Sequence, residues 1–146
     1  MKKTKSILST FPVTSSIVVQ WADMDAAQHV NNVIYLRWAE VSRVDYFDAL
    51  KIEVVPTNGD AGFILGWQDC KYIFPVTYPD TIHIGIRITE VKEDRLLMES
   101  HFFSEKHDRI VAISKQMVVT YDYVNLKKVV VPDLMRERIN KLEELK

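Results

Sequence analysis

One uninterrupted helix pattern constrains the fold more than any other feature of the sequence. Residues Asn32 to Leu50 contain neither glycine nor proline, which predicts one long helix whose N-terminus either Asn31 or Asn32 can cap. At about 100° per residue, its apolar side chains fall nearly all round the helix. Such a helix is expected to be buried by its surroundings. Its charged side chains must then sit at edges, at an interface or in pairs: Arg37, Glu40, Arg43, Asp45 and Asp48.

The other long patterns alternate apolar and polar residues and predict β-strands. One strand is expected before the helix and four after it: Thr14–Trp21, Phe63–Phe74, Thr81–Val91, Leu96–Ser104 and Ile110–Tyr123. A loop with the turn signal Asn58-Gly59 follows the helix. Short turns join the last strands, so these strands must be antiparallel, because parallel neighbours need crossovers of a dozen or more residues. Pro132 then opens an amphipathic C-terminal helix.

This order of elements predicts how the long helix is buried. The helix is about 28 Å long, and the economical way to cover it is to curl the antiparallel sheet around it. We therefore expect an α+β fold, with about five strands wrapped around one central helix and a C-terminal helix added. A single domain over residues 1–146 is expected, with residues 1–12 flexible. The open helix edge and the unpaired strand edges predict a homodimer or homotetramer.

Composition excludes several classes of function. Lys and Arg number 19 against 20 Asp and Glu, a net charge of −1, which argues against a nucleic-acid binder. Cys70 is the only cysteine, so no intrachain disulfide is possible, and we expect a buried, inert thiol. The basic N-terminus lacks the apolar core of a signal peptide. No segment approaches the roughly 20 apolar residues of a membrane helix, so we expect a cytoplasmic protein without a membrane partner.

A motif spans the entry to the helix and its first half. It reads D-x-D-x3-H-V-N-N, followed by Y and then E-x-x-R, and is carried by Asp23, Asp25, His29, Val30, Asn31, Asn32, Tyr35, Glu40 and Arg43. It resembles the signature of the hydroxybenzoyl-CoA thioesterase type of hotdog proteins. The resemblance continues at residues 72–82 and 118–122, and covers about residues 14 to 132. It implies the hotdog fold, in which a curled sheet wraps one helix.

The resemblance implies a thioesterase that hydrolyses acyl-CoA, with coenzyme A as part of the substrate, no other cofactor and no metal. The second aspartate of the motif, Asp25, then acts on the thioester carbonyl as nucleophile or as base for water. A helix N-terminus beside it can hold the developing oxyanion with its unpaired N–H groups. The alternative for Asp25 is that it simply caps a turn.

The other motif residues have two interpretations each. His29 orients the carboxylate or the substrate, or is a satisfied loop residue. Asn31 and Asn32 are expected to act mainly as helix caps, and Asn32 is also able to face the site. Asp23 is expected to accept loop N–H bonds, and Tyr35 to pack in the core. We expect Asp25, His29 and Asn32 on the catalytic side of the site, and the following residues to contact substrate: Asp23, Asn31, Tyr35, Lys106 and Arg109.

Two further helix residues and one departure from the signature affect the site. Glu40 and Arg43 are expected to form an i, i+3 ion pair. In a second subgroup of these thioesterases a helix glutamate supplies the carboxylate, which makes Glu40 the reserve candidate. Gln28 stands where the family has glycine, a residue that permits unusual backbone dihedrals. The loop geometry and the rate both depend on how Gln28 is accommodated.

Substrate contacts outside the motif are expected from charge and from aromatic residues. Coenzyme A is anionic, so a nearly neutral chain must gather cations locally, and two turns do so: Lys92 and Arg95 in one, Lys106, His107 and Arg109 in the next. Each could also be merely solvated. Aromatic residues suggest an apolar tunnel for the acyl group: Trp67, Tyr72 and Phe74.

Other functions fit the sequence less well. An EF-hand starting at Asp23 fails because Ala27, Gln28 and Ile34 occupy ligand or glycine positions. Zinc-ligand spacings, the serine hydrolase elbow and a phosphate-binding glycine loop are all missing from the sequence. Two rivals remain on the same fold: an acyl-thioester dehydratase or hydratase, and a non-catalytic acyl-ligand binding module. The acyl group and its carrier, coenzyme A or an acyl-carrier protein, stay open.

Overall fold

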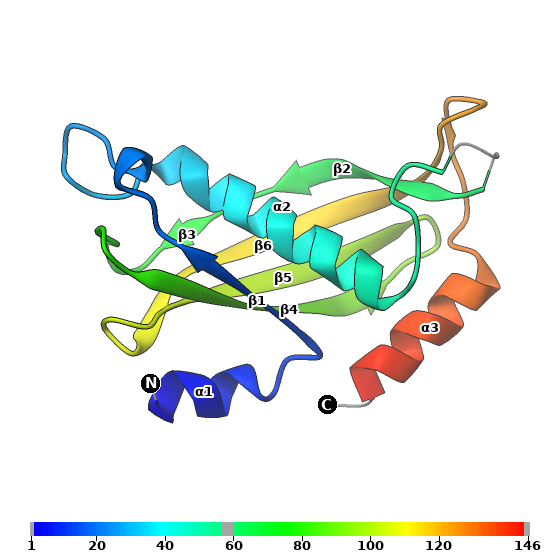
Figure 1. The fold of residues 1–146 in the computed structure, drawn as a ribbon. Helices are drawn as coiled ribbons and strands as arrows, with labels where there is room; N and C mark the ends of the chain where they lie inside the picture. Colours follow the sequence, from blue (N-terminus) through cyan, green and yellow to red (C-terminus); the bar gives the residue numbers. More distant parts are fainter. Residues whose placement is uncertain (1, 57–59, 145–146) are drawn as a thin grey trace.

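The computed structural model describes residues 2–56 and 60–144 and is shown in Figure 1. The expected Asn58-Gly59 turn lies outside the described residues. Within the described residues, three α-helices, one 3-10 turn and seven strands follow one another: α1 Lys2–Leu8, β1 Val13–Val18, η1 Trp21–Asp23, α2 Asn32–Ala49, β2 Gly62–Gln68, β3 Lys71–Tyr72, β4 Thr81–Val91, β5 Arg95–Ser104, β6 Arg109–Asp122, β7 Lys127–Lys128 and α3 Asp133–Glu144.

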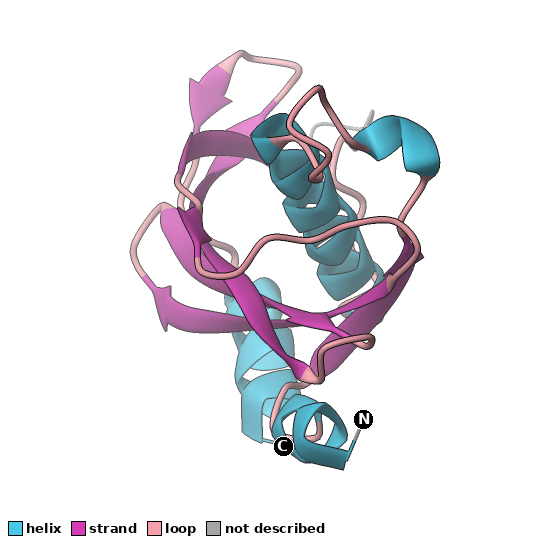
Figure 2. Cartoon of the chain, turned by 90° about the vertical axis from the view of Figure 1, so that its left-hand side faces the viewer, coloured by secondary structure: helices cyan, strands magenta, loops and turns pink. Residues whose placement is uncertain are grey.

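The sheet is antiparallel throughout, in the order β1-β4-β5-β6-β2. Two strands of two residues each, β3 and β7, add to β6 and were not predicted as separate strands. The sheet curls around α2, as the view along the helix shows (Figure 2). Helices α1 and α3 lie outside the curl in both views (Figures 1 and 2). The predicted hotdog architecture is therefore confirmed.

The start of helix α2 is fixed by its N-cap residue, Asn31. The side-chain oxygen of Asn31 accepts the Val33 N–H at 2.9 Å, so Asn31 is the N-cap and Asn32 is the first helical residue. One face of the helix is buried against the sheet and consists of Tyr35, Trp38, Ala39, Ser42, Arg43, Tyr46 and Phe47. Isoleucines of β4 pack beneath it, because alternate residues of that strand point to the same side.

The opposite face of α2 is exposed, unlike the all-round burial that its composition suggested. Val33 is 62% exposed, and Val41 and Val44 are exposed as well. These residues lie at helical spacing on one face. The single chain therefore covers only one side of the helix and leaves three valines exposed, interspersed with the exposed Arg37, Glu40 and Asp48.

Two strand predictions were wrong at their ends because side chains redirect the backbone. The first strand stops at Val18, since the Asp23 carboxylate accepts the Gln20 N–H at 2.8 Å and closes a 3-10 turn; Trp21 is 72% exposed. The expected strand Phe63–Phe74 is broken after Gln68, where the Asp69 carboxylate accepts the Lys115 N–H at 2.9 Å.

The described segments nearest the two ends also form helices that contact the rest of the structure. Residues 1–12 were expected to be flexible, whereas α1 forms over Lys2–Leu8 and the Thr4 N–H donates to Asp108 at 2.9 Å. At the other end, α3 buries Met135 and Ile139, as its amphipathic pattern predicted.

The turn that contains the second aspartate of the motif is closed by two backbone bonds. The Gln28 N–H donates to the Asp25 carbonyl at 3.0 Å, and the Asp25 N–H donates to the His29 carbonyl at 3.1 Å. Within this turn Gln28 has φ of 65°. This is the left-handed region that glycine enters readily and that a residue with a Cβ atom enters at a cost. Gln28 thus adopts the kind of backbone that the family glycine permits.

We predict that Gln28→Gly stabilises the protein. Glycine relieves the left-handed strain, but it also increases the entropy of the unfolded chain, which offsets part of the gain. The net effect should raise the free energy of unfolding by up to ~1 kcal/mol and Tm by about 2–4 °C. The matched control is Ala27→Gly, one residue earlier and without a positive φ, which should lower stability by about 0.5–1 kcal/mol. Equal destabilisation by the two variants in urea titrations would contradict the strain at Gln28.

Candidate active site

The loop between β1 and α2 is held at its base by Asp23. Its carboxylate accepts the Gln20 N–H, and its carbonyl accepts the Asn31 N–H at 2.9 Å. Val19 and Val30 at the two ends of the loop are buried in the core. Asp23 therefore acts as the loop anchor that the sequence suggested, and its carboxylate is engaged by the backbone.

Asp25 sits at the exposed end of this loop. One oxygen, Oδ1, accepts the Ala27 N–H at 2.9 Å, which is the turn-capping role named as its alternative. Across residues 2–56 and 60–144, no group is hydrogen-bonded to the other oxygen. The two roles are compatible, because one oxygen fixes the carboxylate while the second is left for chemistry.

A cavity of about 330 Å³ lies beside this loop, at the N-terminal end of α2. Three of the predicted residues line it, His29, Asn32 and Tyr35, and its other walls are Val30, Tyr72, Ile73, Phe74 and Pro75. Asp25 is not among the lining residues. It stands in the adjoining turn, bonded through its N–H to the carbonyl of His29, one of the walls.

The helix terminus presents a free donor at this cavity. The Val33 N–H is taken by the Asn31 side chain and the Ile34 N–H by the Asn31 carbonyl. In the described part of the chain, no acceptor is bonded to the Asn32 N–H. With the positive end of the helix dipole behind it, this N–H can polarise a carbonyl oxygen. The Asn31 side chain is engaged as the cap, so it does not reach the cavity wall.

Two tyrosines and the single cysteine form one electrostatic group next to the cavity. The Tyr72 hydroxyl donates to the Asn32 carbonyl at 3.0 Å, and its ring packs edge-on against Tyr35. Burial, reinforced by Cys70, raises the pKa of both Tyr35 and Tyr72 to about 12. Burial also raises the pKa of the Cys70 thiol. Both phenols and the thiol are therefore uncharged at neutral pH. Cys70 is half-buried, so the expectation of a buried cysteine was wrong in its burial.

Of the three aromatic residues expected in an acyl tunnel, two reach the cavity. Tyr72 and Phe74 line it, whereas Trp67 lies on β2 and is exposed. The hydrogen bond from Tyr72 to the helix terminus could not be inferred from sequence, because the two residues are 40 positions apart. The signal that indicated this wall was the aromatic run before Pro75.

The two cationic turns lie at opposite ends of the β4–β5–β6 hairpins, about 33 Å apart for a ten-residue strand. Only the second is near the cavity: the Arg109 guanidinium lies 4.3 Å from the centre of the Phe74 ring, and the His107 ring is 4.9 Å from it. Lys106 and Arg109 are exposed. In the first turn, Arg95 is paired with Asp94 at 2.8 Å. The expectation that both turns lie near the mouth of the site holds for the second turn alone.

Glu40, the reserve carboxylate, lies far from this cavity. It is eight residues beyond Asn32, about 12 Å along the helix, and exposed. The expected ion pair with Arg43 does not form within the described residues. Arg43 instead turns into the core, where its guanidinium donates to the Gln116 side chain at 3.4 Å.

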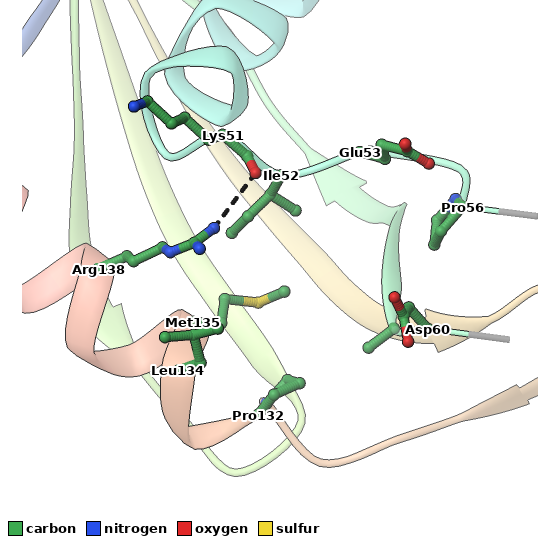
Figure 3. Close-up of a pocket in the computed structure, with 10 residues that line it drawn as sticks. Lys51, Ile52, Glu53, Pro56, Asp60, Pro132, Leu134, Met135 and Arg138 are labelled. Atoms are coloured by element: carbon green, nitrogen blue, oxygen red, sulfur yellow. Dashed lines mark hydrogen bonds between the residues drawn. The ribbon is translucent and has the colours of Figure 1, made fainter. Parts of the chain in front are cut away.

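A separate cavity of about 450 Å³ lies at the other end of α2, between the loop after the helix and α3 (Figure 3). Arg138 donates to the Lys51 carbonyl across it, the contact drawn in Figure 3, and to the Leu50 carbonyl. These bonds satisfy carbonyls at the helix C-terminus, so Arg138 has a structural role here. No residue of the motif lines this cavity.

Two other kinds of functional element are absent from the described residues. In residues 2–56 and 60–144 there is no group of three or more His, Cys, Asp or Glu side chains placed to hold a metal ion. Among the helices of the same residues, none has the length and apolar character needed to cross a membrane.

Many solved structures share this fold, and three thioesterases among them illustrate the likeness. A thioesterase from Thermus thermophilus, complexed with coenzyme A and Zn, is 24% identical with a TM-score of 0.79 over 92% of this chain and 96% of that one. A 1,4-dihydroxy-2-naphthoyl-CoA thioesterase from Synechocystis is 17% identical (TM-score 0.78; 89% and 96% covered). The DHNA-CoA thioesterase from Staphylococcus aureus is 18% identical (TM-score 0.79; 90% and 91% covered).

Sequence comparison places the chain in a family. No curated protein sequence matches it. The model of the thioesterase-like superfamily matches residues 19–139, from the strand before the motif into the C-terminal helix. This match covers most of the chain and includes the Asp25 loop, the central helix and the strands that follow it. Together with the curled sheet around α2, it confirms the resemblance drawn from the motif: the chain is a hotdog-fold member of the thioesterase-like superfamily.

Proposed function

We propose that this protein hydrolyses acyl-CoA thioesters to the free acid and coenzyme A, with Asp25 as its catalytic carboxylate. The observation that carries the proposal is the Asp25 turn, which is bonded to His29 beside a cavity at the N-terminus of α2. The carboxylate has one oxygen without a partner among the described residues, and the Asn32 N–H is a free donor in the same part of the chain. A nucleophile or base and an oxyanion donor are the two groups that thioester hydrolysis requires.

The reaction then proceeds at the entrance of the cavity. The thioester oxygen faces the Asn32 N–H, whose partial positive charge stabilises the oxyanion. Asp25 either takes a proton from the attacking water or attacks the carbonyl carbon itself, forming an anhydride that water hydrolyses. In both routes the C–S bond breaks, coenzyme A leaves as the thiolate that a proton neutralises, and water supplies the acid's new oxygen. His29 lines the cavity and positions substrate or carboxylate.

The two rival functions are less well supported by the site. A dehydratase or hydratase relies on a histidine and an acid acting as a pair, whereas the His29 side chain makes no hydrogen bond to Asp25 within the described residues. A non-catalytic binding module would be favoured if Gln28, in the position of the family glycine, disrupted the turn. That residue keeps the positive φ which glycine would adopt, so the substitution leaves the turn in place.

We further propose that copies of the chain assemble, as a homodimer or a homotetramer. Val44, on the exposed face of α2, lines a cavity with Ile64 and Leu65 of the edge strand β2. These residues and Trp67 of the same strand are exposed. An uncovered edge strand beside an apolar helix face is a template for pairing. The partner would then add walls to the cavity at the end of α2. Light scattering at assay concentration measures this, and a fully active monomer would contradict it.

The catalytic role of Asp25 is tested by Asp25→Asn. Asparagine keeps an oxygen that can accept the Ala27 N–H, so the turn and the fold should persist. It removes the charge needed for attack or proton transfer, so kcat should fall by at least ~10²-fold. Thiol release from acyl-CoA, followed together with the circular dichroism spectrum, measures both expectations. Near wild-type turnover in the folded variant would remove the role from Asp25, and Glu40→Gln would then test the reserve carboxylate.

The second cationic turn is tested by the double variant Lys106→Ala, Arg109→Ala. If these side chains hold the phosphates of coenzyme A, KM should rise about 10-fold, the equivalent of ~1.4 kcal/mol, while kcat changes little. The dependence of KM on salt should also weaken, because fewer ionic contacts remain to be screened. The matched control is Lys92→Ala, Arg95→Ala at the distant turn, which should leave KM unchanged. Equal KM values in both double variants would remove the Arg109 turn from the site.

A further inference from the structure

The short segment before β4 is bonded to the loop that carries Asp25. Its Val76 carbonyl accepts the Val30 N–H at 2.8 Å, and its Asp80 carbonyl accepts the Val19 N–H at 2.9 Å. Val19 and Val30 are the two ends of the loop, and both are buried. Main-chain bonds from this segment therefore hold the Asp25 loop at each end.

The side chain of Asp80 holds the cationic turn between β5 and β6. One oxygen, Oδ1, accepts the N–H groups of Thr81 and Lys106 at 2.7 and 3.0 Å. The other, Oδ2, accepts the Ser104 hydroxyl. The Ser104 oxygen in turn accepts the His107 N–H at 3.1 Å, so the network extends one residue further along the turn. Asp80 is 8% exposed and Ser104 is fully buried, and hydrogen bonds are stronger in such an interior than in water.

The same turn packs against the cavity at the N-terminus of α2. The rings of His107 and Phe74 are 4.9 Å apart, and the Arg109 guanidinium lies 4.3 Å from the centre of the Phe74 ring. Phe74 lines the cavity. On its other side the turn is held by α1, where Asp108 accepts a main-chain N–H. Without its bonds to the Asp80 side chain, the turn would keep this second attachment but lose its fixed position beside the cavity.

We propose that Asp80 is a positioning residue for the recognition of coenzyme A. Its carboxylate holds the turn that presents Lys106 and Arg109 to the phosphates, while its carbonyl holds the Asp25 loop. The proposal rests on the proposed function, since it takes this turn as the binding site of the phosphates. The two tasks use different atoms of one residue. Loss of the side chain should therefore weaken binding of the phosphates and leave the loop and its chemistry in place.

The negative charge of Asp80 makes the expected result discriminating. A carboxylate near a phosphate site repels the phosphates, so removal of its charge alone should strengthen the binding of coenzyme A. Removal of its hydrogen bonds should weaken that binding, because the cationic side chains are no longer held in one arrangement. The two effects have opposite signs, and weaker binding therefore identifies the positioning role.

The test compares one acyl group carried by coenzyme A and by pantetheine, which forms the same thioester without the phosphates. The wild-type protein should give a kcat/KM for acyl-CoA at least ~10-fold above that for acyl-pantetheine. Asp80→Ala should lower this ratio to ~2 or less by raising KM for acyl-CoA, with kcat for both substrates little changed. Asp80→Asn keeps an oxygen for the Lys106 N–H and should retain roughly half of the wild-type ratio.

The matched control is Asp122→Ala, at the opposite end of β6 (Figure 1). Asp122 is 7% exposed and holds the β6–β7 turn in the same manner. Its carboxylate accepts the N–H groups of Val124 and Asn125 and the side-chain amide of Asn125. Its loss should lower Tm, as the loss of Asp80 does, but leave the substrate ratio unchanged. An equal fall of the ratio in both variants would reduce Asp80 to a general structural role.

Three other outcomes overturn the proposal: a wild-type ratio near 1, a ratio in folded Asp80→Ala at or above the wild-type value, or an equal loss of turnover on both thioesters in that variant. If Asp80→Ala does not fold, Asp80→Asn takes its place, and a ratio at or above the wild-type value there has the same meaning. Calorimetry with free coenzyme A separates this role from catalysis, because Kd should rise at least ~5-fold in Asp80→Ala. If no thioester is hydrolysed, the proposed function fails, whereas Asp80-dependent binding of coenzyme A still supports the positioning role.

Discussion

The structure depends on the packing of α2 across the concave face of the sheet. Its buried face contributes to two apolar clusters, one around Tyr35 and Trp38 near the N-terminus and one around Tyr46 and Phe47 near the C-terminus. Between them Ser42 bonds to Ser100 at 2.9 Å and begins the buried polar network that reaches Arg43. The first cluster also includes Val19 and Val30, the two ends of the Asp25 loop. Packing of the helix therefore holds both ends of the loop and leaves its middle in solvent.

This arrangement explains how a small domain can position a reactive carboxylate without burying it. The Val30 N–H donates to the Val76 carbonyl at 2.8 Å, so the loop is joined to the segment that carries Phe74 and Pro75. Phe74 and Pro75 line the cavity beside the Asp25 loop. Arg109 covers Phe74 from the neighbouring turn. A nearly neutral chain can thus present a local positive charge at one cavity.

Much of the fold could be predicted because local pattern and tertiary packing agree. The alternating isoleucines of β4 and the unbroken helix pattern after Asn31 both formed as expected. The errors occur where a distant group decides the backbone: Asp69 bonds to Lys115 across the sheet, and Thr4 bonds to Asp108. Prediction of the site was limited in the same way, by contacts between residues far apart in the sequence. The motif located the loop and three cavity residues, but the inward turn of Arg43 depends on Gln116, which is 73 positions away.

The most direct measurement is release of free thiol from a panel of acyl-CoAs by the purified wild-type protein. The account predicts turnover of at least one member, with one thiol and one free acid formed for each thioester consumed. Since an unhydrolysed but bound thioester is the signature of a binding module, calorimetry should accompany the assay. Binding of acyl-CoAs without thiol release across aliphatic and aromatic members would contradict the account.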